Sequence, residues 1–415
     1  MNFRETNKIK TINDPVYGFI TLPSELVFDV MEHPYFQRLR RIKQLGLTNY
    51  VYPSAHHTRF QHALGAMHLM RQATGVLRSK GIEISRDESE GLCLAILLHD
   101  IGHGPFSHTL EKSIVKDLTH EALSDMFITR LNRQFDGRLE LALTIFRGEY
   151  RKKWLHQLVS SQLDMDRLDY LSRDSFFTGV AEGTINTDRI INMLTVCNDE
   201  LVVEAKGIYS IEKFIIARRL MYWQVYLHKA VLAADQMLVN ILRRAKLLGE
   251  SGIELPATPA FRFFLVNSVG KEDFIRTPEW LEQFALLDDF DIVTSIKLWM
   301  DHPDKVLSLL CRNLIHRKLF RTEMQNEPFS GEHILRIQKA TAVKYGLTDE
   351  ETGYFANTDI VQNHAYNPRH DKILIRTSDG NLTDVASASE QLDIAVLSTT
   401  VSKHILVCPK DIQPV

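Results

Sequence analysis

The chain has 415 residues, a formal net charge of −3 and a pI of about 6.6. This length exceeds the usual size of one hydrophobic core, so we expect one large core with appended segments. The mildly acidic balance argues against a general affinity for nucleic acid or anionic membranes, without excluding a local basic pocket.

The sequence also gives an expectation for the cellular location of the protein. Four widely spaced cysteines without a CxxC pair favour reduced thiols. The N-terminus lacks the apolar segment of a signal peptide, and no apolar run is long enough to cross a bilayer. The sequence therefore predicts a soluble, cytoplasmic protein with no membrane partner.

The N-terminal run NDPVYGFITL, residues 13–22, combines Asp-Pro and glycine turn signals with β-branched and aromatic residues, which predicts a short hairpin. Beyond it, apolar residues recur every three or four positions over most of the chain, which indicates α-helices. The predicted helices cover 24–46, 62–80, 88–100, 120–135, 154–174 and 208–248. The predicted fold class is therefore mainly α.

Composition suggests where the chain divides. Loop-type runs at 249–259 (GESGIELPATP) and 324–332 (MQNEPFSGE) set off a further helical stretch. After residue 371, the runs KILIRT, LDIAVL and KHILVCP predict short strands. We predict four segments: an N-terminal hairpin and helix packed on the core (1–55), a helical core (56–250), a helical extension (251–350) and a small C-terminal α/β appendage (351–415).

The dipeptide His99-Asp100 stands where a helix should end. It follows the apolar run LCLAILL and precedes IGHGPFSH, which is too rich in glycine and proline to continue a regular helix. An imidazole nitrogen beside a carboxylate suits Fe, Mn, Zn or Mg, and two adjacent ligands need others from elsewhere in the fold. His62 and Asp166 are the candidates.

A His-Asp dipeptide also arises by chance, and His370-Asp371 is interpreted in that way because no glycine turn follows it. The context of the first pair is different. Gly102 and Gly104 would let the backbone turn sharply after it. The histidines between residues 99 and 120 are more than core packing requires: His99, His103, His108 and His120.

Downstream, Gln162, Asp166, Tyr170 and Asp174 follow at intervals of four residues. A helix would place them on one slowly drifting face. A solvated helix face has the same spacing, so the pattern alone leaves both interpretations open.

Taken in chain order, NDPVYGFI, FQRLRRIKQLG, TRFQHALG, LLHDIGHGPFSH and DMDRLDYLSRD resemble the motifs of the HD-domain phosphohydrolases, and in particular of the deoxynucleoside triphosphate (dNTP) triphosphohydrolases. The resemblance covers roughly residues 10–240. It implies that 56–250 form an HD-domain hydrolase core. It further implies a divalent or trivalent metal held by His62, His99, Asp100 and Asp166.

The resemblance also implies roles for further residues. His103 and His120 would support the attacking water and bind phosphate, and His108 would protonate the leaving oxygen. Glu111, beside His108, stands where the relatives often carry Asp. The implied substrate contacts are Gln44, Leu45, Arg59, Arg167, Tyr170, Asp174 and Arg218.

The implied reaction is attack of metal-activated water at the α-phosphate of a dNTP, with release of deoxynucleoside and triphosphate. Two alternatives stay open: an HD-type nucleotidase or phosphodiesterase that acts on another phosphoester, and a nucleotide-sensing regulator with a non-catalytic HD site. The long helices predict a homo-oligomer, either a dimer or a tetramer.

Overall fold

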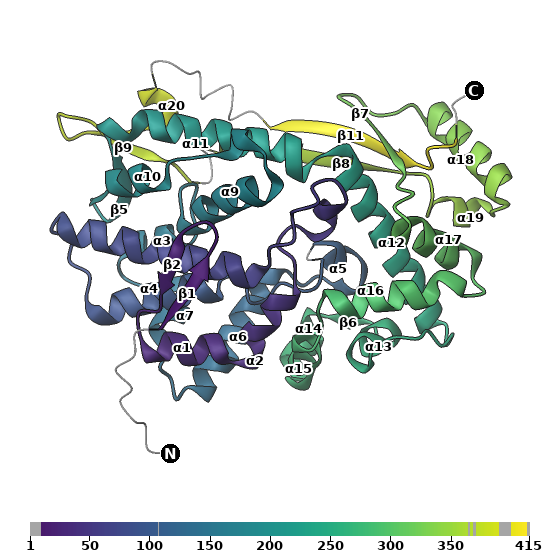
Figure 1. The fold of residues 1–415 in the computed structure, drawn as a ribbon, viewed down its shortest axis with the longest axis horizontal. Coiled ribbons are helices and arrows are strands. Elements are labelled where there is room, and N and C mark those ends of the chain that lie inside the picture. The colour runs from purple at the N-terminus through teal and green to yellow at the C-terminus, as the bar shows by residue number, and fades with distance from the viewer. Residues whose placement is uncertain (1–9, 107, 364–365, 368–370, 390–399, 413–415) are drawn as a thin grey trace.

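A computed structural model describes residues 10–106, 108–363, 366–367, 371–389 and 400–412, without the side chains of residues 108, 111–112 and 115–116. Helices form most of the structure (Figure 1), which confirms the mainly α fold class. The predicted N-terminal hairpin and a small sheet in the C-terminal segment are also present.

The carboxylate of Asp14 stabilises the turn of the N-terminal hairpin. Its strands are β1 (Thr11–Asp14) and β2 (Gly18–Thr21), which pair antiparallel. Asp14 Oδ1 accepts the backbone N–H of Val16 at 2.9 Å and of Tyr17 at 3.0 Å. An aspartate that bonds the backbone two and three residues ahead stabilises such a turn.

The predicted helix 24–46 is wrong, because the chain forms short pieces there. The pieces are α1 (Glu25–Glu32), α2 (Pro34–Gln37) and 3₁₀ turns at Arg38–Arg41 and Gly46–Tyr50. Proline has no N–H, and its ring disfavours a helical conformation in the residue before it. His33 is accordingly extended, with ψ of 138°, and its side chain caps α2.

Three helices form the centre of the fold: α3 (Arg59–Ser79), α4 (Arg86–Leu98) and α9 (Met165–Thr178). Local capping fixes where they begin. Ser85 and Glu88 form a capping box at α4, and the Asp164 side chain accepts the N–H of Arg167 at the start of α9. Because α3 packs against both α4 and α9, residues distant in sequence meet at its first turns.

Further helices lie around this centre and to one side of it (Figure 1). Those up to residue 250 are α5 (His108–Ser113), α6 (His120–Gln134), α7 (Glu140–Phe146), α8 (Lys153–Val159), α10 (Thr187–Met193), α11 (Ile208–Met221) and α12 (Lys229–Glu250). Those beyond it are α13 (Pro259–Val266), α14 (Lys271–Arg276), α15 (Glu279–Ala285), α16 (Asp289–Leu298), α17 (Lys305–Ile315), α18 (Gly331–Tyr345), α19 (Asp349–Thr352) and α20 (Val385–Ala388). Additional 3₁₀ turns lie at Ala181–Gly183, Ala205–Gly207 and Trp299–Asp301.

Small sheets join distant parts of the chain. Their strands are β3 (Val115–Lys116), β4 (Leu194–Cys197), β5 (Glu200–Glu204), β6 (Val269–Gly270), β7 (Arg321–Gln325), β8 (Asn357–Asn363), β9 (Leu374–Arg376), β10 (Leu382–Asp384) and β11 (Val401–Cys408). One sheet has the order β10-β9-β5-β4, another β7-β11-β8, and β3 pairs with β6. The four-segment division stays a prediction, although β9 pairs with β5 from the predicted core.

The strands predicted at 372–377 and 403–409 are confirmed as β9 and β11, whereas the one at 392–397 lies outside the described residues. The predicted loop 324–332 is wrong at its start, because β7 runs to Gln325 and pairs along β11. The sequence does not show this strand because RTEMQ is polar, and its pairing partner lies about eighty residues further along the chain.

Two more predicted helices are interrupted. The range 154–174 divides into α8 and α9, because Ser160 is extended, with ψ of 105°, and Asp164 then caps the start of α9 through the N–H of Arg167. The range 208–248 contains a π-helical turn at Tyr222–Tyr226, where Leu227 N–H bonds the carbonyl of Tyr222, before α12 begins. Gln162 therefore precedes α9, and the predicted four-residue face begins only at Asp166.

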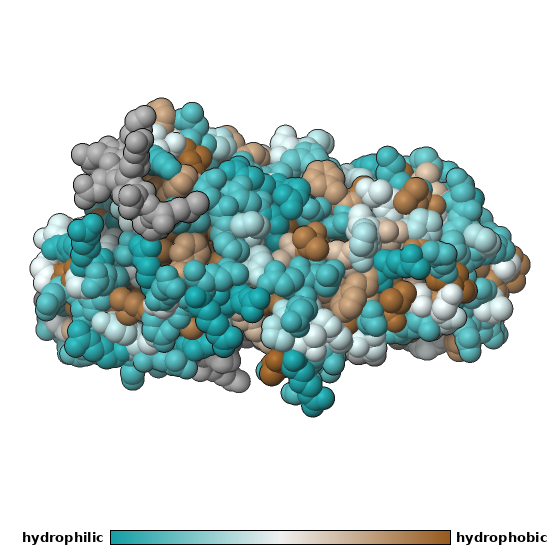
Figure 2. Space-filling model, turned by 90° about the horizontal axis from the view of Figure 1, so that it is seen from below, coloured by the Kyte–Doolittle hydropathy of each residue, from teal (hydrophilic) through white to brown (hydrophobic). Residues whose placement is uncertain are grey.

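The surface in Figure 2 is mostly hydrophilic, with apolar residues in small separate groups. Among the described residues, no helix is both long enough and apolar enough to span a membrane.

Candidate metal centre

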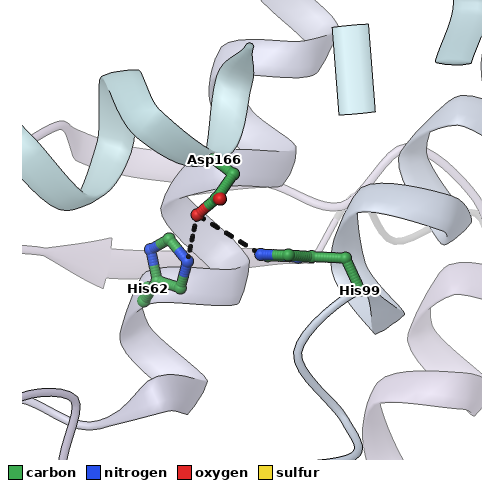
Figure 3. A group of neighbouring side chains, drawn as sticks. All are labelled: His62, His99 and Asp166. Atoms are coloured by element: carbon green, nitrogen blue, oxygen red, sulfur yellow. Dashed lines mark ion pairs between the residues drawn. The ribbon is translucent and has the colours of Figure 1, made fainter. Parts of the chain in front are cut away.

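Three of the predicted ligands meet although they come from different helices. His62 belongs to α3, Asp166 lies in the first turn of α9, and His99 follows the last residue of α4. Their ligating atoms all lie within 4.8 Å of one another (Figure 3). Asp166 Oδ1 is 3.1 Å from His62 Nε2 and 3.4 Å from His99 Nε2.

Hydrogen bonds behind the two imidazoles set their orientation. The Nδ1 atom of His62 lies 2.7 Å from Asp169 Oδ2, and Nδ1 of His99 lies 2.6 Å from the carbonyl of Ile96. Both partners are acceptors, so each Nδ1 carries the hydrogen and each Nε2 presents its lone pair to the group. Metal-binding histidines are commonly held in this way.

The donor set fits a cation. Nε2 of His62 and Nε2 of His99 are buried, and neither has a hydrogen-bond partner among the described residues, because their close contacts with Asp166 lack hydrogen-bond geometry. Burial alone would lower the pKa of His62, but the carboxylates of Asp166 and Asp169 raise it to about 10. The surroundings thus favour positive charge at Nε2, which either a proton or a metal ion can supply.

Asp100 lies beside this group. Its Oδ1 is 3.3 Å from His99 Nε2, and its Oδ2 is 3.8 Å from His62 Nε2. Oδ2 also accepts from Arg59 Nη1. Burial would raise the pKa of Asp100, but His99, His103 and Arg59 hold it well below its usual range, so the carboxylate is ionised.

His103 and His120 stack on each other, with ring centroids 3.9 Å apart. His103 Nε2 is 3.3 Å from Asp100 Oδ1, which connects this pair to the metal group. Burial and the charge of Arg59 lower the pKa of His103 to about 3, so its imidazole is neutral near pH 7. The predicted side chains of His108 and Glu111 lie outside the described residues.

The chain turns after His99-Asp100 as predicted, but the turn does not use the left-handed conformation that glycine allows. Neither Gly102 nor Gly104 has a positive φ, whereas Phe106 does, at +50°. Gly102 is instead required by close packing, since a Cβ there would lie 2.2 Å from the carbonyl oxygen of His120. The absent side chain lets the loop approach α6 and so brings His120 to the site.

Each predicted phosphate-binding arginine contacts a side-chain oxygen. Arg59 donates to Asp100, as described above. Arg167 Nη1 donates to Asp164, and Arg218 Nη1 donates to Gln162 Oε1 at 3.0 Å. The Nε atoms of Arg167 and Arg218 are buried without a hydrogen-bond partner among the described residues. Both guanidiniums therefore keep donors for another acceptor.

Tyr170 and Asp174 lie along α9, and Asp174 holds a polar cluster that the sequence did not reveal. Its two oxygens contact His57 Nε2 at 2.7 Å and the hydroxyl of Tyr226 at 2.6 Å. The ring of Tyr226 lies 6.3 Å from that of Tyr170. Burial raises the pKa of Tyr170, while the charge of Arg218 lowers it.

Gln44 and Leu45 lie in the segment before α3. The N–H of Gln44 donates to the carbonyl of His57, and Lys43 forms an isolated β-bridge with Thr58. The Gln44 Oε1 atom is buried without a hydrogen-bond partner among the described residues. The structure therefore places this segment next to the Asp174 cluster, through His57.

A mainly helical fold with a His, His and Asp group, of which His62 is buried and His99 and Asp166 are partly exposed, fits a metal-dependent hydrolase of the HD type. Comparisons with known proteins agree. The HD domain model matches residues 59–174, and the HD associated region model matches residues 185–254.

A crystal structure of a phosphohydrolase from Bacteroides thetaiotaomicron is 51% identical, covers 97% of this chain and all of that chain, and superposes with a TM-score of 0.94. The Bacillus subtilis protein YwfO is 33% identical over 89% of this chain and 80% of its own length. Human deoxynucleoside triphosphate triphosphohydrolase SAMHD1 is 31% identical over 77% of this chain and 56% of its own length.

The chain belongs to the HD-domain phosphohydrolase superfamily and resembles the dNTP triphosphohydrolases within it. Its activity class is metal-dependent phosphohydrolysis.

Proposed function

We propose that this protein hydrolyses dNTPs to deoxynucleoside and triphosphate, with His62, His99, Asp100 and Asp166 as metal ligands. The observation that carries the metal site is the pair of buried Nε2 atoms that face Asp166 Oδ1 without hydrogen-bond geometry. The likeness to human SAMHD1 supports the substrate class.

The donor set narrows the cation. Two imidazole nitrogens with two carboxylates suit Fe, Mn or Zn, whereas Mg prefers oxygen ligands. When bound, such a cation supplies a more acidic water and neutralises charge on a phosphoryl oxygen.

Side chains of the protein would neutralise the substrate charge, orient the water and protonate the leaving oxygen. Arg59, Arg167 and Arg218 would neutralise the triphosphate, because guanidinium groups donate two parallel hydrogen bonds to phosphate oxygens. The neutral His103, stacked on His120, would orient the attacking water through its ring nitrogen. In the scheme implied by the family, His108 with Glu111 would protonate the leaving oxygen.

The binding face for the nucleoside would be formed by Tyr170, Asp174, Gln44 and Leu45. Asp174 accepts from Tyr226 and contacts His57, so its carboxylate is held in one orientation. A fixed acceptor of this kind can receive a sugar hydroxyl.

Product analysis tests the proposal. The purified chain, loaded separately with Mn²⁺, Fe²⁺ or Zn²⁺, is incubated with each dNTP, each NTP, nucleoside monophosphates and a cyclic nucleotide. We expect triphosphate and deoxynucleoside in equal amounts from dNTPs. Orthophosphate from monophosphates would indicate a nucleotidase instead, and no turnover by protein with stoichiometric metal would indicate a regulator.

We further propose that the chain is a homo-oligomer, as the long helices α11 and α12 suggest. Light scattering on the eluting protein should give a mass of at least twice 47.8 kDa. A monomeric mass over the working concentration range would contradict this.

A further inference from the structure

We propose that Asp169, Arg173 and Asp14 form a buried relay that positions His62 toward the metal, so that the N-terminal hairpin is part of the metal site. The inference rests on the proposed role of His62 as a metal ligand. The three relay residues touch neither metal nor substrate in this proposal, and we class them as positioning residues.

The first link joins α3 to α9. His62 Nδ1 lies 2.7 Å from Asp169 Oδ2, and both side chains are completely buried. Asp166, on the same helix as Asp169, faces the opposite ring nitrogen of His62. One turn of α9 therefore holds both ends of the imidazole, and Asp169 fixes which nitrogen carries the hydrogen.

The second link is a buried ion pair within α9. Arg173 donates from Nε to Asp169 Oδ2 and from Nη2 to Asp169 Oδ1, each at 3.0 Å. The guanidinium is completely buried, so it has no water to replace a lost carboxylate. The two parallel bonds fix the plane of the Asp169 carboxylate.

The third link joins Arg173 to the N-terminal hairpin. Arg173 Nη1 donates to Asp14 Oδ2 at 2.8 Å, and Asp14 is the residue whose Oδ1 closes the hairpin turn. The ring of Tyr17, in the same turn, lies 5.5 Å from the Arg173 guanidinium. One carboxylate thus bonds the hairpin backbone on one side and the relay on the other.

The packing of α3 has a gap in which this relay fits. Gly65 stands one turn after His62, and a Cβ there would lie 1.9 Å from Asp169 Oδ1 and 2.2 Å from Arg173 Nη2. The ion pair therefore occupies the space where any other residue would carry its side chain. Glycine at this position is required by the relay, because a helix interior otherwise favours alanine.

The charges explain why the outer link matters at His62. Arg173 is shared between two carboxylates, Asp14 and Asp169. Without the charge of Asp14, the guanidinium interacts with Asp169 alone and withdraws electron density from the oxygen that accepts the His62 hydrogen bond. A weaker acceptor makes the imidazole a weaker ligand.

The test measures metal affinity rather than turnover. Mn²⁺ is titrated into the metal-free full-length chain, and free Mn²⁺ is followed by its electron paramagnetic resonance signal. We expect Asp169→Asn to weaken binding by about 10- to 100-fold, and Asp14→Asn by a smaller factor of about 3 to 10. Asn at position 14 keeps an oxygen for the turn, so the substitution removes the charge and the 2.8 Å contact between Asp14 Oδ2 and Arg173.

A matched control is available at the start of α17. Asp304 caps that helix through the N–H of Leu307 at 2.8 Å and pairs with Arg244, as Asp14 caps its turn and pairs with Arg173. Asp304→Asn should lower the thermal midpoint of the metal-free protein without changing Mn²⁺ affinity. Asp14→Glu, which keeps the charge, should restore most of the affinity if the relay is electrostatic.

The double variant separates a relay from two independent effects. If Asp14 acts through Asp169, Asp14→Asn adds nothing to the loss already caused by Asp169→Asn. The Co²⁺ visible spectrum should also change in Asp14→Asn, because it reports the ligand field at the metal. Should Asp14→Asn fail to fold, Asp14→Ser, which also keeps an oxygen for the turn but carries no charge, takes its place in each measurement.

The outcomes distinguish this inference from the proposed function. Wild-type affinity in both Asp14→Asn and Asp169→Asn would overturn the relay and leave the metal site intact. A loss of Mn²⁺ affinity in Asp169→Asn but not in Asp14→Asn would show that the hairpin is not part of the relay. Equal Mn²⁺ binding by His62→Ala and wild type would overturn the metal site itself, and the relay with it.

Discussion

Replacing Gly102 by alanine should damage catalysis by moving the loop after His99-Asp100 away from α6. The added Cβ would lie 2.2 Å from the His120 carbonyl oxygen and 2.3 Å from the N–H nitrogen of Ser124. Both are backbone atoms, and these distances are about 1.2 Å shorter than the 3.4 Å at which ordinary van der Waals contact begins. A displacement of about 1 Å near reacting groups can lower a rate by about 100-fold, or about 2.7 kcal/mol.

We therefore expect kcat/KM for metal-dependent hydrolysis to fall by about 100-fold, with the metal retained and stability reduced by about 1–3 kcal/mol through overpacking. Steady-state kinetics, metal analysis and urea unfolding measure the three quantities. Gly75→Ala is the control, because Gly75 lies on α3 with nothing within 4 Å of its Cβ position. Wild-type kcat/KM in folded Gly102→Ala would refute the packing argument.

Three further predictions concern separate parts of the molecule. Asp166→Ala should lose both bound metal and activity, and an active, metal-loaded variant would exclude Asp166 as a ligand. Arg218→Lys keeps the charge but not the planar fork, so KM for dNTP should rise by about 10-fold or more while metal content stays unchanged. Burial raises the pKa of Asp289 from 3.8 to about 6, so the folded state holds this proton more tightly than the unfolded chain. As pH rises from about 4 to 7, the free energy of unfolding of the wild type should therefore fall by up to about 3 kcal/mol more than that of Asp289→Asn. Urea titrations measure both free energies, and the same decrease in the two proteins would contradict this prediction.

The helices at the site were predictable because their signals are local. Apolar periodicity predicts α3, α4 and α6, and the motif order predicts the family. The long helix expected over 24–46 fails at Pro34, whose effect on His33 outweighs the apolar pattern. The strand β7 was missed because its partner β11 lies far away in the sequence, and strand pairing is a tertiary property.

The sequence by itself determined the fold class, the resemblance to the HD phosphohydrolases and the set of candidate ligands, because these depend on residue types at fixed spacings. The tertiary structure alone decided which side chains stand behind the ligands. That Asp169 reaches His62, and that Arg173 reaches Asp14, follows from the close approach of α3, α9 and the hairpin at Gly65. No spacing encodes such contacts, because they arise only when three separately formed elements pack together.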